Sequence, residues 1–230
     1  MVESAENRKT TAMNYLPPKT CEALIKVLRE KGITDERVLD AFRKVPRHLF
    51  VDGTMFNQAY HDNALPIECG QTISQPYVVA LMTQLLSLKK DEKILEIGTG
   101  SGFQTAILAQ FSRRVYTIER QRELAERSRK RLKEMGYENI AFKQGDGSSG
   151  WASQGPFAKI LVTAGAPVVP EALLEQLETG GRMIIPVGDR SLQELVVYDK
   201  TENGFAKHSE GGVIFVPLIG QHGWKEGEKG

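Results

Sequence analysis

Between residues 93 and 187, short apolar runs alternate with longer segments whose apolar residues recur at helical spacing. We predict helices over residues 103–111, 123–135 and 170–177. The predicted strands cover residues 93–97, 115–118, 140–142, 160–163 and 183–187, with later strands at 195–198, 205–208 and 213–218. This alternation predicts an α/β fold in which helices cover both faces of a mostly parallel, doubly wound sheet.

The part of the chain before this pattern is predicted to be helical. One helix covers residues 20–31, and a second begins after Thr34 or Asp35 and ends before Pro46. Another begins at Pro76, which suits the first turn of a helix, and runs to about residue 88. We interpret its wide apolar face, which includes Val79 and Met82, as core packing without a role in cofactor binding.

The boundaries that follow define one domain between two tails. Residues 1–15 are expected to be a disordered tail and residues 221–230 a second tail. Residues 16–220 are expected to form a single domain. Within it, residues 16–90 are a helical part that caps the site or binds substrate, and residues 91–220 are the cofactor-binding sheet.

Composition excludes several classes of protein. The 30 basic and 29 acidic residues lack the basic excess that is typical of nucleic-acid binding. Neither an apolar signal segment nor a run of 18 apolar residues is present, so no membrane association is expected. Cys21, Cys69 and four scattered histidines suit neither a disulfide framework nor a metal site. These features indicate a cytoplasmic protein, which we expect to be a monomer.

A glycine-rich turn follows the first predicted strand of the alternating region. Residues 96–102 read Glu-Ile-Gly-Thr-Gly-Ser-Gly, and glycine allows both a sharp turn and close approach of a ligand to the backbone. Ligands of doubly wound sheets bind at this end of the strands. The spacing G-x-G-x-G, with Phe103 next, differs from the dinucleotide fingerprint G-x-G-x-x-G. A dehydrogenase, a methyltransferase and a turn without any ligand remain possible on this motif alone.

Acidic residues at three successive strand ends favour S-adenosylmethionine. Glu96 suits the ammonium group of a methionine, and Glu119 is placed to accept both hydroxyls of a ribose. Asp146 could accept a hydrogen bond from an adenine amino group, which NAD sites rarely need. Each acid taken singly is more often a capping or surface residue, but the three together favour S-adenosylmethionine over NAD.

Other motifs resemble one particular methyltransferase family. Residues 59–67 read Ala-Tyr-His-Asp-Asn-Ala-Leu-Pro-Ile, and residues 70–76 read Gly-Gln-Thr-Ile-Ser-Gln-Pro. Together with residues 45–51, 95–102, 145–151 and 215–218, these resemble the protein-L-isoaspartate O-methyltransferase family. The resemblance extends from about residue 20 to residue 218. Its Thr-Ile-Ser-x-Pro segment is specific to that family, whereas many methyltransferases share the glycine turn.

The resemblance implies a Rossmann-like methyltransferase fold with added N-terminal helices. It further implies methyl transfer from S-adenosylmethionine to the free carboxylate of L-isoaspartyl residues in damaged proteins and peptides, with S-adenosylhomocysteine as product. Ser74 matches the active-site serine. The matching cofactor positions are Thr72, Ile73, Ser74, Glu96, Gly98, Thr99, Gly100, Glu119, Asp146 and Gly147. The sequence departs from the family pattern at residues 68–69, at residues 148–149 and at Ile219, which leaves the local contacts open.

The chemistry of the acceptor sets what the site must do. A carboxyl of the aspartyl type, with a pKa of about 4, is already ionised at neutral pH, so no general base is needed. Ser74 could donate a hydrogen bond that aligns the carboxylate, or it could cap the helix that begins at Pro76; both roles can coexist. Residues 52–70 are hypothesised to bind the acceptor backbone.

Three other functions compete with this interpretation. One is a methyltransferase for a different acceptor, such as RNA or a small molecule. Residues 163–167 read Thr-Ala-Gly-Ala-Pro and lack the Asn-Pro-Pro-Tyr pattern that is common in RNA enzymes of this class. A non-catalytic binding module predicts a degraded glycine turn, which is not seen, and a dehydrogenase is disfavoured by the glycine spacing.

Overall fold

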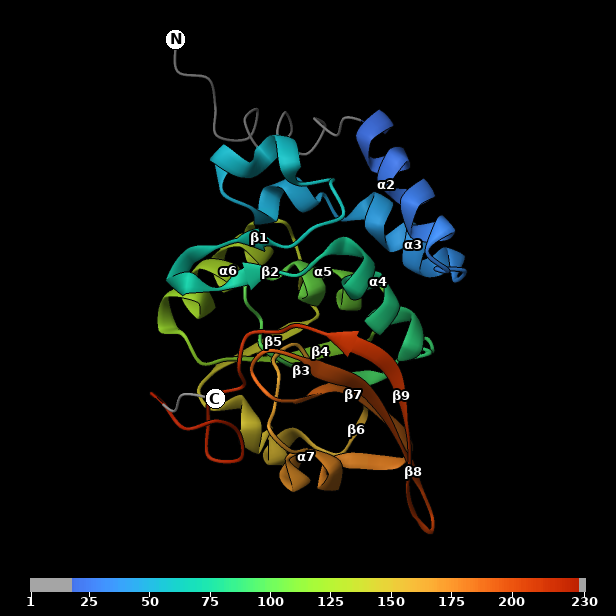
Figure 1. The fold of residues 1–230 in the computed structure, drawn as a ribbon, viewed down its shortest axis with the longest axis vertical. Coiled ribbons are helices and arrows are strands. Elements are labelled where there is room, and N and C mark those ends of the chain that lie inside the picture. The colour runs from blue at the N-terminus through green and yellow to red at the C-terminus, as the bar shows by residue number, and fades with distance from the viewer. Residues whose placement is uncertain (1–17, 228–230) are drawn as a thin grey trace.

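The computed structural model describes residues 18–227, and a seven-stranded sheet lies at its centre (Figure 1). The strand order is β5-β4-β3-β6-β7-β8-β9. The strands are β3 (Lys93–Ile97), β4 (Arg114–Glu119), β5 (Ile140–Gln144), β6 (Phe157–Val162), β7 (Leu177–Gly188), β8 (Gln193–Thr201) and β9 (Gly204–Val213). The pairs from β5 to β7 are parallel, and β8 and β9 are added antiparallel. The predicted α/β class is confirmed.

Helices lie on both faces of this sheet. Helices α5 (Phe103–Ala109) and α6 (Arg122–Glu134) follow β3 and β4, whereas α7 (Glu171–Glu175) follows β6 and lies on the opposite face (Figure 1). After β3 the chain continues to β4, which pairs with one side of β3. Later in the chain, β6 pairs with the other side of β3. The crevice beyond the carboxyl ends of β3 and β6 is therefore the topological switch point, where such sheets bind ligands.

The N-terminal helices cover the face that carries α5 and α6. Helix α2 (Pro18–Glu30) contacts α3 (Glu36–Lys44), and both contact α4 (Pro76–Leu85). Asp35 caps α3 by accepting the backbone N–H of Arg37. Two 3₁₀ segments follow, η1 (Arg47–Phe50) and η2 (Gly53–Gln58).

A short antiparallel ladder connects these segments to α4. Strand β1 (Leu65–Pro66) pairs with β2 (Thr72–Ile73), and the turn η3 (Glu68–Gly70) lies between them. The ladder places Thr72 and Ile73 just before α4, and Ser74 lies at the junction. The family-specific segment is therefore positioned by the N-terminal part of the chain.

Two predictions about the C-terminal strands were wrong. Helix α7 ends at Glu175, and β7 begins at Leu177 instead of residue 183, so Gly180 and Gly181 lie inside the strand. The pairing of β6 with β7 is irregular there, and glycine in a strand often marks such an irregularity. The predicted strand at residues 213–218 is only an isolated bridge between Gly165 and Pro217.

The two predicted tails lie partly outside residues 18–227. The predicted disordered tail over residues 1–15 lies outside the described residues. From residue 221 onward a second tail was predicted, but the chain still contacts the body there: the indole N–H of Trp224 donates to the Gly165 carbonyl at 3.1 Å. Within residues 18–227, every helix is too short or too polar to cross a bilayer.

Candidate functional site

A cavity opens at the switch point of the sheet, and we call it the loop cavity because the glycine turn forms its floor. Eight of the ten predicted site residues line it: Thr72, Ile73, Ser74, Gly98, Thr99, Gly100, Glu119 and Gly147. The remaining two, Glu96 and Asp146, do not. The family-specific segment and the glycine turn are separated in sequence, but the fold brings both to the lining of one cavity.

The backbone of the glycine turn has no room for side chains at Gly98. This residue has φ +97°, and a Cβ there would overlap the hydroxyl oxygen of Thr163. That hydroxyl bonds the carbonyls of Ile97 and Gly98 at 2.9 and 2.7 Å, which fixes the turn against the end of β6. A ligand can therefore approach the backbone of the turn directly.

Glu119 presents a fixed carboxylate to the loop cavity. Its Oε2 atom accepts the backbone N–H of Gly100 and its Oε1 atom accepts that of Gln121, both at 2.9 Å. The side chain is almost fully buried, and each oxygen keeps acceptor capacity toward the cavity. This geometry suits a pair of neighbouring hydroxyl donors, such as those of a ribose.

Glu96 lies beneath the glycine turn rather than in the wall of the cavity. Its Oε2 atom accepts the hydroxyls of Thr105 and Thr117, each at 2.6 Å, and Thr99 in turn bonds Thr117 at 2.6 Å. Burial raises the pKa of Glu96 to about 8, against the effect of the two hydroxyl bonds. Glu96 is absent from the lining of the cavity, and it supports the turn from below through Thr117 and Thr99.

Asp146 does not line the loop cavity either, although the adjacent Gly147 does. The Asp146 carboxylate accepts the backbone N–H and hydroxyl of Ser148 through Oδ1, and the backbone N–H of Gln221 through Oδ2 at 2.7 Å. Burial acts to raise the pKa of Asp146, but these hydrogen bonds outweigh it and leave the pKa below its ordinary value. Asp146 thus anchors the C-terminal segment.

The sequence departures have local structural roles. The buried Ser148 hydroxyl connects Asp146 to the backbone N–H of His222 at 3.0 Å, and Ile219 lines the loop cavity. At the other departure, Glu68 forms an ion pair with Arg127 of α6, 2.5 Å between Oε1 and Nη1. Cys69 has φ +57° and is exposed. All three departures therefore lie in connecting segments, two of them near the C-terminal segment and one against α6.

Ser74 lies between the loop cavity and a second one, and its hydroxyl forms no hydrogen bond with the described residues. The residue before α4 is Gln75, without a side-chain cap, so Ser74 does not cap this helix. Asp62 instead accepts the backbone N–H of Tyr77 at 2.8 Å. Two roles were considered for Ser74, helix capping and alignment of a carboxylate. The structure does not show the capping role, and the hydroxyl is available for a ligand.

The second cavity runs between α4 and the end of β9, and we call it the edge groove. It shares Thr72, Ser74, Thr163, Phe215 and Val216 with the loop cavity. Its other lining residues are Ala64, Gln75, Tyr77, Val78, Leu81, Leu192, Glu210, Gly212, Val213 and Ile214. Of the stretch 52–70, which was expected to bind the acceptor backbone, only Ala64 lines this groove.

Several wall residues were not predicted from the sequence. Val79 and Met82 are buried in the core, as expected, but they also line the loop cavity, so the interpretation of α4 as core alone was incomplete. Gln104 of α5 lines the cavity as well, and its amide donates to the Thr83 hydroxyl of α4 at 3.0 Å. An apolar helical face gives no signal that one part of it will border a ligand.

Comparison with protein families gives one match that spans the described sheet and helices. The model for protein-L-isoaspartate (D-aspartate) O-methyltransferase matches residues 19–223. A protein-L-isoaspartate O-methyltransferase of Dictyoglomus turgidum is 53% identical over 89% of this chain and 93% of its own length. One from Trichlorobacter lovleyi is 57% identical over 85% and 90%.

Solved structures agree with the sequence comparison. A structure of a protein-L-isoaspartate O-methyltransferase superposes with a TM-score of 0.81 at 29% identity, over 88% of this chain and 67% of the other. A candidate enzyme of the same description from Plasmodium falciparum, in complex with S-adenosyl-L-homocysteine, gives a TM-score of 0.74 at 28% identity, over 86% and 97%. The chain therefore belongs to the protein-L-isoaspartate (D-aspartate) O-methyltransferase family.

Proposed function

We propose that this protein repairs damaged proteins and peptides by transferring a methyl group from S-adenosylmethionine to the free carboxylate of L-isoaspartyl residues. S-adenosylhomocysteine is the second product. We further propose that residues 16–220 act as one domain, and that the protein works as a monomer in the cytoplasm. One observation carries the assignment of the site: the free hydroxyl of Ser74 lies where the loop cavity meets the edge groove.

The loop cavity fits the methyl donor. The Glu119 carboxylate is held by two backbone N–H groups and suits the ribose hydroxyls, and the backbone of residues 98–100 is open to the ligand. We propose that the methyl donor contacts Thr72, Ile73, Gly98, Thr99, Gly100 and Gly147. Glu96 supports the glycine turn, and Asp146 holds the C-terminal segment. S-adenosylmethionine, when bound, supplies an electrophilic methyl group on a sulfonium.

The edge groove is proposed to bind the acceptor. An isoaspartyl carboxylate in this groove meets Ser74 at the junction with the loop cavity, and the hydroxyl can donate to one carboxylate oxygen and direct the other toward the loop cavity. The carboxylate is ionised at neutral pH, so no residue needs to remove a proton. Alignment of the two reactants can be worth about 7–11 kcal/mol. The apolar residues Val79 and Met82 help to exclude water from the junction.

An RNA acceptor is less well supported by the groove. RNA binding relies on basic side chains that contact phosphates. The only charged residue that lines the edge groove in the described part of the chain is Glu210, an acid. A small-molecule acceptor remains the alternative, and methylation of peptides distinguishes an isoaspartyl acceptor from it.

The test uses two peptides that differ only in carrying isoaspartate or aspartate at one position, with S-adenosylmethionine labelled in its methyl group. Base-labile label on the isoaspartyl peptide alone supports the function. In Ser74→Ala we expect kcat/KM to fall about ten- to a hundredfold, the usual range for a hydrogen bond to a charged group, with unchanged affinity for S-adenosylhomocysteine. Equal label on both peptides, or none on either, contradicts the proposal.

A further inference from the structure

We propose that the edge groove selects acceptors by the residues that flank the isoaspartate. Glu210 disfavours an acidic neighbour and favours a basic one, and Leu192 with Ile214 favours an apolar neighbour. This inference rests on the proposed function, because it requires the edge groove to hold the acceptor. It adds a selectivity that neither the glycine turn nor Ser74 can supply.

The position of Glu210 depends on an irregularity in the sheet. Val196 pairs with Ser209 and Glu194 pairs with Gly212, so Glu210 and Gly211 together oppose a single residue of β8. Such a β-bulge changes the direction of side chains and is frequent next to active sites. Gly211 has φ +108°, a conformation that suits glycine. The bulge thus places the Glu210 side chain in the wall of the edge groove.

The charge of Glu210 is only weakly compensated. Its basic neighbour is His208, with 3.1 Å between Nε2 and Oε1, and both side chains are partly exposed. No lysine or arginine of the described chain forms an ion pair with Glu210. Since the other lining residues of the edge groove are uncharged, its carboxylate is the charged group that a bound peptide contacts there.

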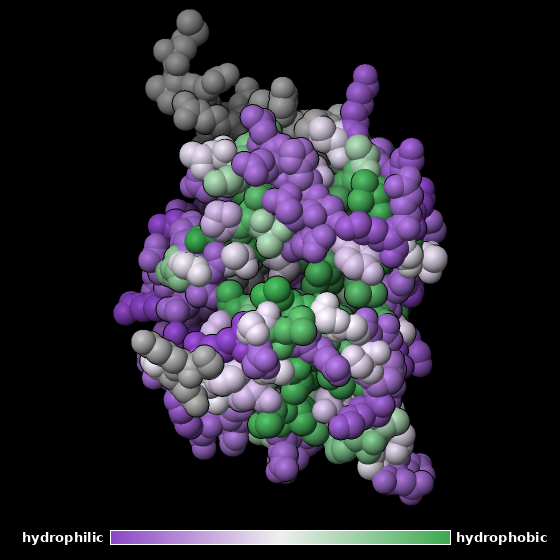
Figure 2. All heavy atoms as spheres, viewed as in Figure 1, coloured by the Kyte–Doolittle hydropathy of each residue, from purple (hydrophilic) through white to green (hydrophobic). Residues whose placement is uncertain are grey.

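Two apolar residues of the groove are largely open to solvent. Leu192 is 57% exposed and Ile214 is 75% exposed, and both line the edge groove together with Val78 and Leu81 of α4. Figure 2 shows hydrophobic surface across the middle of this face, in the region where α4 and the end of β9 approach each other in Figure 1. Scattered apolar residues are ordinary on a surface, but this pair adjoins the groove that contains Ser74.

Because the edge groove is continuous with the site at Ser74, we infer that its occupant is the acceptor peptide itself. When an isoaspartyl carboxylate lies at Ser74, the residues on either side of it extend along the groove. An apolar neighbour can contact Leu192 and Ile214, and a charged neighbour meets Glu210. Exchange of lysine for glutamate reverses the sign of that interaction, and partial screening limits its effect to about three- to tenfold in kcat/KM.

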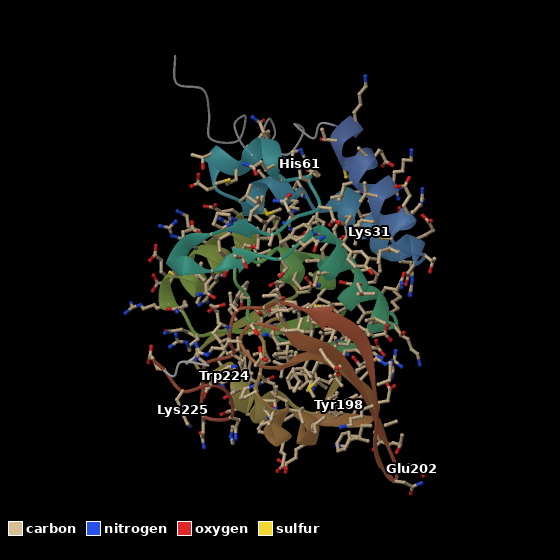
Figure 3. All side chains as sticks on the ribbon, viewed as in Figure 1. Lys31, His61, Tyr198, Glu202, Trp224 and Lys225 are labelled. Atoms are coloured by element: carbon tan, nitrogen blue, oxygen red, sulfur yellow. The ribbon has the colours of Figure 1, made fainter. Side chains whose placement is uncertain are left out.

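The first experiment compares isoaspartyl peptides that carry lysine or glutamate next to the isoaspartate, before it in one series and after it in another. For the unmodified protein we expect kcat/KM to be about three- to tenfold higher for lysine in at least one series. Glu210→Gln should bring that ratio to about one. Glu202→Gln is the matched control, since Glu202 lies at the tip of the same β8–β9 hairpin, away from the groove (Figure 3).

The second experiment tests the apolar wall with peptides that carry leucine or serine at the same positions. The unmodified protein should prefer leucine, and Leu192→Ser should reduce the preference about threefold. Val168→Ser is the control, because Val168 is 65% exposed but lies outside the edge groove. Melting temperatures of all four variants should equal that of the unmodified protein.

The outcomes separate the two levels of proposal. Methylation of every isoaspartyl peptide with equal kcat/KM, or ratios unchanged in Glu210→Gln and Leu192→Ser, overturns the selectivity while the function stands. Loss of the charge preference in Glu202→Gln as well as in Glu210→Gln also overturns it, since a long-range charge effect would then explain the result. If no isoaspartyl peptide is methylated although S-adenosylhomocysteine binds, the proposed function itself fails.

Discussion

The Oδ1 atom of Asp62 accepts the backbone N–H of Tyr77 at 2.8 Å, which caps the first turn of α4 from outside the helix. The same carboxylate accepts the Gln75 amide at 3.0 Å and forms an ion pair with Lys31 at 2.6 Å. Lys31 lies at the C-terminal end of α2 (Figure 3). Asp62 therefore joins α2, α4 and the segment after Ser74, and leaves the Ser74 hydroxyl unused by the fold.

Replacement of Asp62 by alanine is expected to destabilise the protein and to misplace Ser74. Loss of a helix cap costs about 1–2 kcal/mol. The kcat for methyl transfer should fall more than the affinity for S-adenosylhomocysteine, since only the Ser74 side of the site is loosened. Asp62→Asn is the matched control, because its amide oxygen can still accept the Tyr77 N–H. If Asp62→Asn and Asp62→Ala lose kcat equally, the cap does not position Ser74.

Glu96 predicts a stability that depends on pH. Its pKa in the folded protein, about 8, lies above the ordinary value of 4.5, so folding favours the neutral form. This stabilisation is complete below pH 4.5 and is lost as the pH rises through 8. Glu96→Gln lacks that loss. We therefore compare the melting temperature of Glu96→Gln with that of the unmodified protein at two pH values. The variant's value minus the unmodified protein's value should be larger at pH 8 than at pH 5, by at least about 4 °C. Parallel curves for the two proteins would contradict the prediction.

Glu119→Ala should weaken binding to the loop cavity. The substitution removes both acceptors that are held by Gly100 and Gln121, and hydrogen bonds to a charged group are worth about 1.5–3 kcal/mol. Titration calorimetry should show affinity for S-adenosylhomocysteine reduced about ten- to a hundredfold. Glu126→Ala, an exposed acid on α6, serves as the control. Unchanged affinity in Glu119→Ala would exclude Glu119 from ligand binding.

Gly220→Ala is expected to detach the C-terminal segment from Asp146. A Cβ at Gly220 would overlap the Asp146 carboxylate and lie 2.5 Å from the Ser148 hydroxyl oxygen. Hydrogen exchange of the Gln221 and His222 amides should become faster, because their acceptors are displaced. Glu226→Ala, which removes only an exposed ion pair with Arg120, should leave exchange unchanged. Slow exchange in Gly220→Ala would show that Asp146 does not anchor the segment.

Local patterns in the sequence were sufficient for the fold class and for most element positions. The alternation of strands and helices is set by spacing that each segment carries by itself, and β3, β4 and α5 lie where it predicts. The glycine turn can be recognised locally as well, since Gly98 adopts φ +97°, a conformation that glycine allows and most other residues disfavour. The errors arose at β7 and after β9, where glycine and proline interrupt strands whose pairing depends on distant partners.

The site divides in the same way. Short motifs were enough to predict candidate residues for a methyl-donor site, because the chemistry of Ser74, Gly98 and Glu119 can be recognised from their immediate neighbours in the chain. Which acids line the cavity could not be predicted in this way, since the contacts of Glu96 and Asp146 depend on Thr105, Thr117 and Gln221, each of which comes from another element. The edge groove likewise exists only because packing brings α4 against the end of β9, two segments that carry no local record of their contact.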